Sequence, residues 1–352
     1  MASSSVSQRR VALACHDLWK LYGPDPRRAM NAVLSHGNDR ERQRAALARS
    51  AHVAAVAGVS LEVHEAEIFV LMGLSGSGKS TLLRCLTRLI EPTSGRVLLD
   101  GEDLEKAGRK RMIELRRHAM GMVFQNFGLL PHLNVLDNVA FPLRVQGVDT
   151  EKRYARAREM TELVGLSGLE ASFPNQLSGG QQQRVGIARS LAVGPQVWFL
   201  DEPFSALDPL IRRQMQDEFI RLQKMLRKTI VFVTHDVQEA FRLADRIAIM
   251  RDGAIVQMGT PAEIALSPAN DYIAEFLRDI PTLRAIKAAD VMQPLSDTGR
   301  PARTVPATEL VEAILPMILD DASPIGVLDA AGTLAGQITT GRIAELARHG
   351  RA

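Results

Sequence analysis

The stretch Gly73-Leu74-Ser75-Gly76-Ser77-Gly78-Lys79-Ser80-Thr81 constrains the fold of this chain more than any other. It matches the pattern G-x-x-x-x-G-K-[ST], in which glycines let successive backbone N–H groups turn inward around an anion. The apolar run 68–72 before it is typical of a buried strand, and residues 81–86 after it are typical of a helix start. This order predicts a site for the phosphates of a nucleotide at the helix N-terminus. The alternative, a surface loop rich in Gly and Ser, is disfavoured by the preceding strand.

The polar side chains of this loop have distinct predicted roles. Lys79 is placed to reach the β- and γ-phosphates, and the Ser80 hydroxyl is placed to ligate Mg²⁺. Because phosphoryl transfer depends on positioning and charge neutralisation, Lys79 also belongs to the predicted catalytic residues. The predicted nucleotide contacts in the loop are Gly73, Ser75, Gly76, Ser77, Gly78, Lys79, Ser80 and Thr81.

Two acids end a second apolar run, Val197-Trp198-Phe199-Leu200, which is typical of a buried parallel strand. Asp201 fits the acid that holds the magnesium shell. Glu202 is the candidate general base for the attacking water, because the end of a strand beside the loop strand lies near the γ-phosphate. The alternative is a pair of solvated acids at a strand end, and the other motifs disfavour it.

A third motif, Leu177-Ser178-Gly179-Gly180-Gln181, stands far from the loop in sequence. Ser178 is a candidate cap for the helix that follows. The two glycines allow close approach of the backbone to a phosphate. The motif therefore predicts a second anion-binding helix start, and an ordinary capped helix remains the alternative.

These motifs, with Gln125, Ser205-Ala206-Leu207-Asp208 and His235 in their order, resemble the nucleotide-binding subunit of an ABC transporter from Val11 to Leu277. The resemblance implies an α/β fold with an ABC-type P-loop ATPase core, an antiparallel β subdomain and a helical subdomain. It implies ATP and Mg²⁺ as cofactors. It also implies a homodimer in which the third motif of one subunit, the signature, closes over ATP on the other. The residues implied at that interface are Ser178, Gly179, Gly180, Gln181 and Asp208.

The resemblance assigns roles to further residues. His235 is implied to contact the γ-phosphate and to link it to Glu202 as part of the catalytic set. Gln125 is implied to contact Mg²⁺ and the attacking water, and to transmit the nucleotide state to a membrane subunit. Tyr22 is implied to stack on adenine. Trp19 remains an alternative for stacking, and so does an aromatic that only packs within the small antiparallel sheet.

A long stretch between Tyr22 and the loop strand resembles an insert of glycine betaine/proline/choline importers of the osmoprotectant type. Within it, residues 40–49 look helical and strongly basic. The resemblance implies ATP-driven import of a quaternary amine or osmoprotectant, such as glycine betaine, choline or proline. The alternatives are an amino acid or polyamine importer, a soluble ABC ATPase of DNA repair or translation, and a regulatory nucleotide sensor.

The predicted domain organisation has three parts. Residues 1–10 form a flexible N-terminus. Residues 11–278 form the ATPase cassette, with a helical insert at about 24–54 and the helical subdomain at about 126–176. Residues 279–352 form a linker and a small α+β domain whose β-α-β-β-α order resembles a single CBS motif. Such a domain would bind an adenosine-type ligand, sense ionic strength, or serve only in packing.

Composition excludes several classes of protein. The 352 residues are 46% hydrophobic and 24% charged, as in ordinary globular proteins. No apolar run approaches the ~18–20 residues that span a bilayer, and the polar N-terminal residues lack the apolar core of a signal peptide. Cys15 and Cys85 fit a reducing compartment and suggest no metal site. The net charge of +3 does not favour a nucleic-acid partner.

We therefore expect a peripheral protein on the cytoplasmic face of the cell (inner) membrane. The resemblance implies a membrane permease as its direct partner, and a periplasmic or extracellular solute-binding protein as an indirect one. Phe127, Leu129 and Leu130, just after Gln125, are candidates for the contact with the permease, since exposed apolar residues there would serve a partner.

Overall fold

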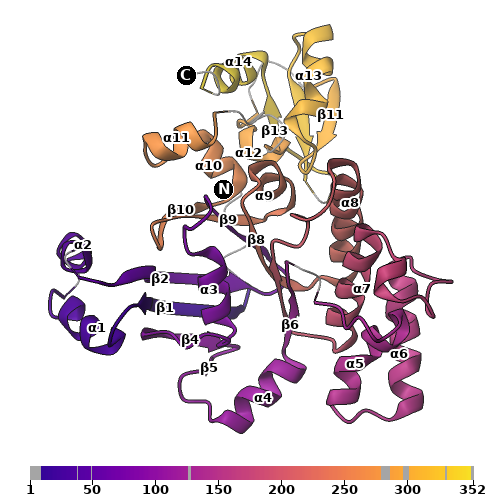
Figure 1. Ribbon diagram of the computed structural model, residues 1–352. Helices are drawn as coiled ribbons and strands as arrows, with labels where there is room; N and C mark the ends of the chain where they lie inside the picture. The colour runs from indigo at the N-terminus through magenta and orange to yellow at the C-terminus, as the bar shows by residue number, and fades with distance from the viewer. Residues whose placement is uncertain are drawn as a thin grey trace. The chain divides into compact units, whose positions relative to one another are not determined.

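The structure is a computed structural model that describes residues 9–37, 39–48, 50–125, 128–278, 286–295, 301–329 and 331–349. The chain forms two compact units, one of residues 9–236 with 248–256, and one of residues 237–247 with those after 256 (Figure 1). The predicted flexible N-terminus lies largely outside the described residues, as do residues 279–285 of the predicted linker. The predicted domain boundaries stay predictions.

A mainly parallel sheet with the strand order β10-β9-β3-β8-β7-β6 carries the phosphate loop after β3 and Glu202 after β7. Its strands are β3 (Ile68–Met72), β6 (Met120–Val123), β7 (Val197–Asp201), β8 (Thr229–Thr234), β9 (Arg246–Arg251) and β10 (Ala254–Gly259). β3 and β7 both pair in parallel with β8, and β6 pairs in parallel with β7. Every residue of β3, β7 and β8 is buried, as expected for strands covered on both faces. The carboxyl ends of these parallel strands therefore share one edge of the sheet, where ligands of such sheets bind.

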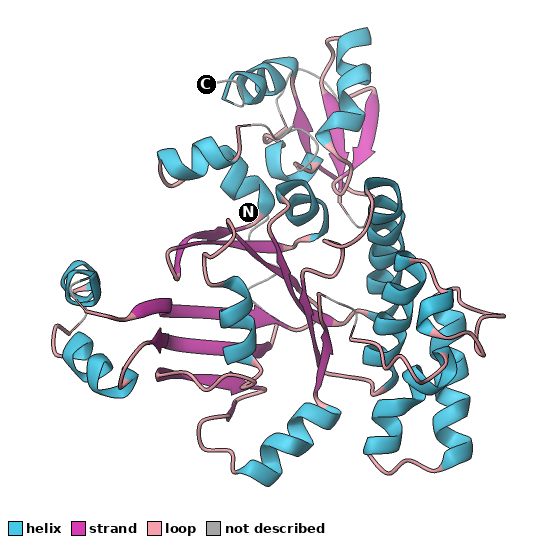
Figure 2. Ribbon diagram, in the orientation of Figure 1, coloured by secondary structure: helices cyan, strands magenta, loops and turns pink. Residues whose placement is uncertain are grey.

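A second, antiparallel sheet has the order β2-β1-β4-β5 (Figure 2). Its strands are β1 (Val11–Tyr22), β2 (Val53–His64), β4 (Ser94–Leu99) and β5 (Glu102–Asp103). One hydrophobic core joins this sheet to the parallel one through α3 (Lys79–Leu86), and it includes Leu13, Phe69, Leu82 and Phe199. The α/β class with an antiparallel subdomain is thus confirmed.

The remaining helices of this unit, apart from the insert, are α4 (Arg109–His118), α5 (Val135–Val145), α6 (Thr150–Leu163), α7 (Gly179–Ala192) and α8 (Pro209–Leu226). α5, α6 and α7 lie side by side and contact one another (Figure 1). Buried Asn138 ties α5 to the segment before it: its amide accepts from the Leu130 N–H and donates to the carbonyls of Leu130 and Leu133. The helical bundle is therefore linked by hydrogen bonds to the chain that follows Gln125.

The predicted insert contains two short helices, α1 (Pro26–Leu34) and α2 (Arg40–Ala48). α1 begins with proline behind an Asp25 cap, which accepts from the Arg28 N–H. A small separate core of Trp19, Leu21, Met30, Val33 and Leu47 attaches both helices to β1.

The second unit carries the C-terminal elements. Its helices are α9 (Val237–Leu243), α10 (Pro261–Leu266), α11 (Asp271–Phe276), α12 (Ala288–Val291), α13 (Val311–Asp320) and α14 (Thr340–His349), and its own sheet has β11 (Arg303–Pro306), β12 (Ile325–Leu328) and β13 (Leu334–Ile338). β12 pairs in parallel with β11 and antiparallel with β13, around a core that includes Val305, Ile314 and Ile338. From β11 onward the order is β-α-β-β-α. The likeness to a CBS motif stays a prediction. Within the described ranges, no helix combines the length and apolar character that crossing a membrane requires.

Candidate active site

The phosphate loop lies between β3 and α3, as the strand-loop-helix pattern predicts. Gly78 caps α3 with a φ of 98°, in the left-handed region that side chains rarely adopt. A Cβ on Gly78 would overlap the carbonyl oxygen of Ala55 in β2. The loop therefore packs directly on the antiparallel sheet, and only glycine fits at this position.

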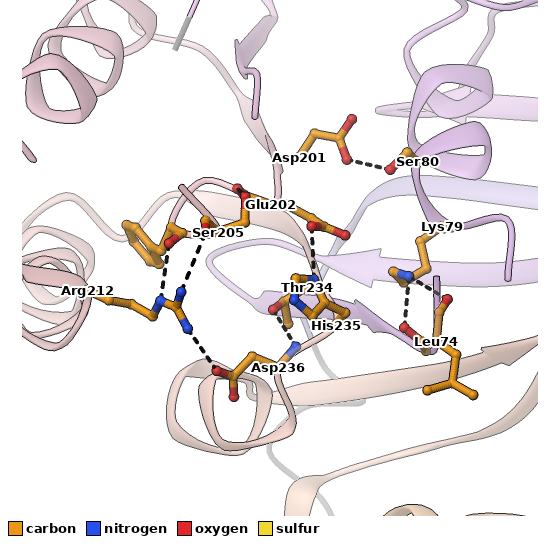
Figure 3. Close-up of polar contacts among 12 residues, drawn as sticks. Leu74, Lys79, Ser80, Asp201, Glu202, Ser205, Arg212, Thr234, His235 and Asp236 are labelled. Atoms are coloured by element: carbon orange, nitrogen blue, oxygen red, sulfur yellow. Dashed lines mark hydrogen bonds and ion pairs between the residues drawn. The ribbon is translucent and has the colours of Figure 1, made fainter. Parts of the chain in front are cut away.

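Lys79 is buried at the first position of α3. Its Nζ donates to the carbonyl oxygens of Gly73 at 2.8 Å and Leu74 at 2.9 Å, so the ammonium group lies inside the curve of the loop (Figure 3). Burial lowers the pKa of Lys79, and the nearby carboxylates of Glu202 and Asp201 oppose this shift. A buried cation in a curved loop is the arrangement that an oligophosphate requires.

Two serines of the loop differ in their partners. Ser77 Oγ is buried and has no hydrogen-bond partner among the described residues, which suits contact with a bound phosphate oxygen. Ser80 Oγ donates to Asp201 Oδ1 at 2.7 Å, across from α3 to the end of β7 (Figure 3). Arg84 approaches the other carboxylate oxygen of Asp201 at 3.5 Å.

These oxygens fit the magnesium ion that the family resemblance implies. A hydroxyl, a carboxylate and an amide oxygen, from Ser80, Asp201 and Gln125, are hard ligands of the kind Mg²⁺ prefers. Ser80 and Gln125 line one pocket, and Asp201 is hydrogen-bonded to Ser80. The residues present therefore fit the ion.

Glu202 and His235 form a direct pair beyond the ends of β7 and β8. His235 Nδ1 donates to Glu202 Oε2 at 2.9 Å (Figure 3). The backbone of Glu202 has a φ of 46°, uncommon for a residue with a side chain, and its N–H donates to the Val233 carbonyl. Strained backbone of this kind is concentrated at functional sites. The pair links the predicted base to the predicted γ-phosphate contact.

A pocket of about 570 Å³ opens over the loop. It brings together many of the predicted residues, namely Ser75, Gly76, Gly78, Lys79, Ser80, Thr81, Gln125 and Glu202. It also contains residues that the sequence analysis missed: Val53, Ala54 and Ala55 of β2, with Asp252 and Gly253. The Asp-Gly dipeptide is a turn signal, but nothing in the sequence marks Val53 to Ala55 as pocket residues.

The two candidate aromatics at the end of β1 have different environments. Trp19 is 1% exposed, and its indole N–H donates to Asp17. Tyr22 is 44% exposed and pairs in register with Val53, which lines the pocket, although Tyr22 itself does not. Of the two aromatics, only Tyr22 is exposed, and the Lys20 ammonium lies 5.1 Å from the centroid of its ring. Stacking of Tyr22 on adenine stays a prediction.

The signature residues lie outside this pocket. Ser178 caps α7 by accepting from the Gln181 N–H, and Gln181 accepts from the Ser178 N–H in return. Gly180 lies so close to Ile211 at the start of α8 that a Cβ would meet its side chain at 2.7 Å. Asp208 caps α8. The two glycines of the signature and the loop before α8 therefore adjoin each other, away from the phosphate loop of the same chain.

A further groove, of about 370 Å³, lies where the helical bundle meets β6. Its apolar lining includes Phe124, Leu130, Phe141 and Val145, and three arginines, Arg116, Arg117 and Arg189, also line it. Of the predicted permease contacts, Leu130 lines this groove. Its sequence neighbour Leu129 is partly buried, and Phe127 lies outside the described residues.

Comparison with known proteins agrees with these features. The ABC transporter family model matches residues 56–205. The chain is 47% identical over 331 residues to the trimethylamine N-oxide transport system ATP-binding protein TmoW of Pelagibacter ubique, covering 94% of this chain and 96% of that protein. It is also 47% identical over 281 residues to the glycine betaine/proline betaine transport system ATP-binding protein ProV of Escherichia coli, covering 80% of this chain and 69% of ProV.

Among solved structures, the chain is similar to a dimeric post-hydrolysis state of the ATP-binding cassette MJ0796 bound to ADP and phosphate. The TM-score is 0.58 at 32% identity, and the match covers 70% of this chain and 97% of that one.

Proposed function

This chain belongs to the ATP-binding subunits of ABC transporters for glycine betaine, proline, choline and trimethylamine N-oxide, and we propose that it hydrolyses ATP to power uptake of such a solute. The solutes of these systems are small molecules. Glycine betaine, choline and trimethylamine N-oxide have a fully substituted nitrogen, and proline is an imino acid. The chain spans 96% of TmoW but 69% of ProV, which favours trimethylamine N-oxide as the first solute to test. Uptake by the complete transporter, with each solute as competitor, distinguishes them.

The loop and its neighbours would bind the nucleotide. Backbone N–H groups of residues 75–79 and Ser77 Oγ surround the phosphates, and Lys79 moves its ammonium from the loop carbonyls to phosphate oxygens. Ser80, Gln125 and Asp201 would hold Mg²⁺, which would neutralise charge on the phosphates.

Glu202 would act as the general base. Its carboxylate accepts the proton of the water that attacks the γ-phosphate. His235 holds this carboxylate in place through the 2.9 Å hydrogen bond from Nδ1. The reaction needs little more than this positioning, because the chemistry of phosphoryl transfer is mainly electrostatic.

The complete site would need two copies of the chain. Ser178, Gly179, Gly180, Gln181 and Asp208 do not line the pocket of their own chain. At the start of α7 the Gln181 N–H already donates to Ser178 Oγ, and the other N–H groups of the first turn would point toward an anion. A second copy placed head to tail would supply them to the bound γ-phosphate. The solved cassette to which this chain is similar is itself dimeric.

The apolar groove beside β6 would receive the permease. Gln125 lies two residues after β6, next to Phe124 of the groove, so a helix in the groove would lie close to a residue of the pocket. In this proposal the subunit would lie on the cytoplasmic face of the membrane, and the solute-binding protein would meet the permease from the other side.

The single observation that carries this function is the Glu202–His235 pair at the pocket over the phosphate loop. We expect Glu202→Gln to bind ATP with wild-type affinity and to accumulate as an ATP-bound dimer. Its hydrolysis rate should fall at least about 100-fold, the usual contribution of a general base. The measurements are phosphate release and sedimentation with and without ATP.

Glu218→Gln is the matched control, since Glu218 pairs with Arg221 on α8 and does not line the pocket. It should hydrolyse ATP like the wild type. Unchanged hydrolysis by Glu202→Gln would remove Glu202 from the mechanism.

A further inference from the structure

Arg212, in the first turn of α8, connects two loops that the mechanism treats separately. Its guanidinium donates from Nε to the Phe204 carbonyl at 3.2 Å, and from Nη2 to the Leu207 carbonyl at 3.1 Å. Nη2 also reaches the Ser205 carbonyl at 3.5 Å. Three carbonyls of the loop between Glu202 and Asp208 thus converge on one side chain. Figure 3 shows the contact with Ser205.

The remaining face of the same guanidinium turns toward the loop after β8. Arg212 Nη1 lies 3.5 Å from Asp236 Oδ2, and Asp236 directly follows His235 (Figure 3). The Asp236 N–H donates to Thr234 Oγ1 at 3.0 Å, and Thr234 is buried as the last residue of β8. The backbone of Asp236 is therefore fixed next to His235, and its carboxylate pairs with Arg212.

These contacts close a ring around the catalytic pair. From Glu202 the chain runs through the loop to Arg212, from Arg212 to Asp236 by the ion pair, and back through His235 Nδ1 to Glu202 Oε2. Ser205 Oγ also donates to the Glu202 carbonyl at 2.9 Å, which fixes the loop to the residue that carries the base.

We propose that Arg212 is a positioning residue that couples the loop 203–208 to the Glu202–His235 pair through Asp236. The proposal rests on the function proposed above, with Glu202 as base. Asp208 ends this loop and caps α8, so any movement of the loop when a second copy binds is transmitted to Arg212. ATP binding by one chain does not involve Arg212, because it does not line the pocket.

The identity of the side chain matters for this role. A guanidinium presents five N–H donors in a rigid plane, which allows one group to bind carbonyls and a carboxylate in different directions. A lysine ammonium keeps the charge, but it lacks the fork and cannot reproduce all of these contacts. Arg212→Lys should therefore restore only part of what Arg212→Gln loses.

The test compares Arg212→Gln, Arg212→Lys, Asp236→Asn and the double variant Arg212→Gln/Asp236→Asn. We expect kcat of Arg212→Gln to fall about 10- to 100-fold, the usual cost of misplacing a catalytic group from a distance. The KM for ATP and the thermal midpoint should stay near the wild-type values. The double variant should be no slower than the slower single variant, because both changes break the same ring.

Arg213→Gln is the matched control, since Arg213 is the exposed neighbour of Arg212 on the same helix turn. It should keep wild-type kcat and KM. If Arg212→Gln does not fold, Arg212→Lys decides: an intermediate kcat with unchanged KM supports the proposal. Wild-type kcat in Arg212→Lys, a change in KM alone, or losses that add in the double variant overturn it.

Glu202→Gln, measured beside these variants, separates the two proposals. If Glu202→Gln is inactive while the Arg212 variants keep wild-type kcat, the positioning role alone is wrong. If Glu202→Gln still hydrolyses ATP, both proposals fail.

Discussion

Two glycines of the phosphate loop show how much a single Cβ can matter. Gly76 and Gly78 both have positive φ, of 81° and 98°. At Gly76 a Cβ would meet nothing within 4 Å, whereas at Gly78 it would overlap the Ala55 carbonyl oxygen. The two positions therefore share the backbone requirement for glycine and differ in crowding.

We expect Gly76→Ala to cost about 1–2 kcal/mol of stability, the strain of a left-handed residue with a side chain. Gly78→Ala should cost more and should abolish ATP binding, because the loop must move off β2 to make room. Urea unfolding and calorimetric ATP titration of both variants measure this. Equal ATP affinity in the two variants would contradict the crowding at Gly78.

At the scale of elements, two helices of the helical bundle begin with the same kind of cap. Ser178 caps α7 through the Gln181 N–H, and Asn134 caps α5 through the Asp137 N–H at 2.7 Å. Both are ordinary caps for local stability. Only the α7 start is proposed to face the nucleotide of a second copy.

We expect Ser178→Ala and Asn134→Ala each to lower the free energy of unfolding by about 1 kcal/mol, the usual value of a cap. Ser178→Ala should in addition weaken ATP-dependent dimerisation about 10- to 100-fold, because a hydrogen bond to a charged group is lost. Sedimentation with ATP in the Glu202→Gln background compares the two. If Asn134→Ala weakens dimerisation as much, the effect is one of stability alone.

At the scale of the whole molecule, one core joins two thiols that are far apart in sequence, one on a strand and one on a helix. Cys15 on β1 and Cys85 on α3 are both fully buried and free. Burial raises the pKa of Cys15 to about 12 and that of Cys85 to about 11, from an ordinary value of 9.0. The folded chain therefore holds these protons at a pH where the unfolded chain releases them.

Stability should consequently fall with rising pH. Below pH 9.0 each buried, protonated thiol makes its full contribution to the free energy of unfolding. That contribution is lost as the pH rises through 11 for Cys85 and 12 for Cys15. The expected slope above pH 9 is about 1.4 kcal/mol per pH unit for each thiol. Urea unfolding between pH 8 and 10.5 measures it.

Lysine and tyrosine side chains titrate in the same pH range, and the double variant Cys15→Ala/Cys85→Ala measures their effect on stability without the thiols. Its stability should depend less steeply on pH than that of the wild type. Identical slopes in the two proteins would show that the thiols ionise equally in both states.

The sequence by itself determined the local chemistry of this protein. The phosphate loop, the acids after Val197 to Leu200 and the capped start of α7 are all written in short contiguous patterns. Buried parallel strands require unbroken apolar runs, and tight anion loops and caps require particular residues, so each pattern has few alternatives. For the same reason the α/β class and the family followed from the sequence.

Only the tertiary structure decided which distant residues contact these local motifs. Val53 to Ala55 join the pocket because β2 pairs with β1 and packs on the loop, and their own sequence is that of an ordinary strand. The burial of Trp19 and the exposure of Tyr22 depend on the small core under the insert. Arg212 meets Asp236 because β7 and β8 are neighbours in the sheet. Such contacts depend on strand order and register between distant segments, which no local pattern encodes.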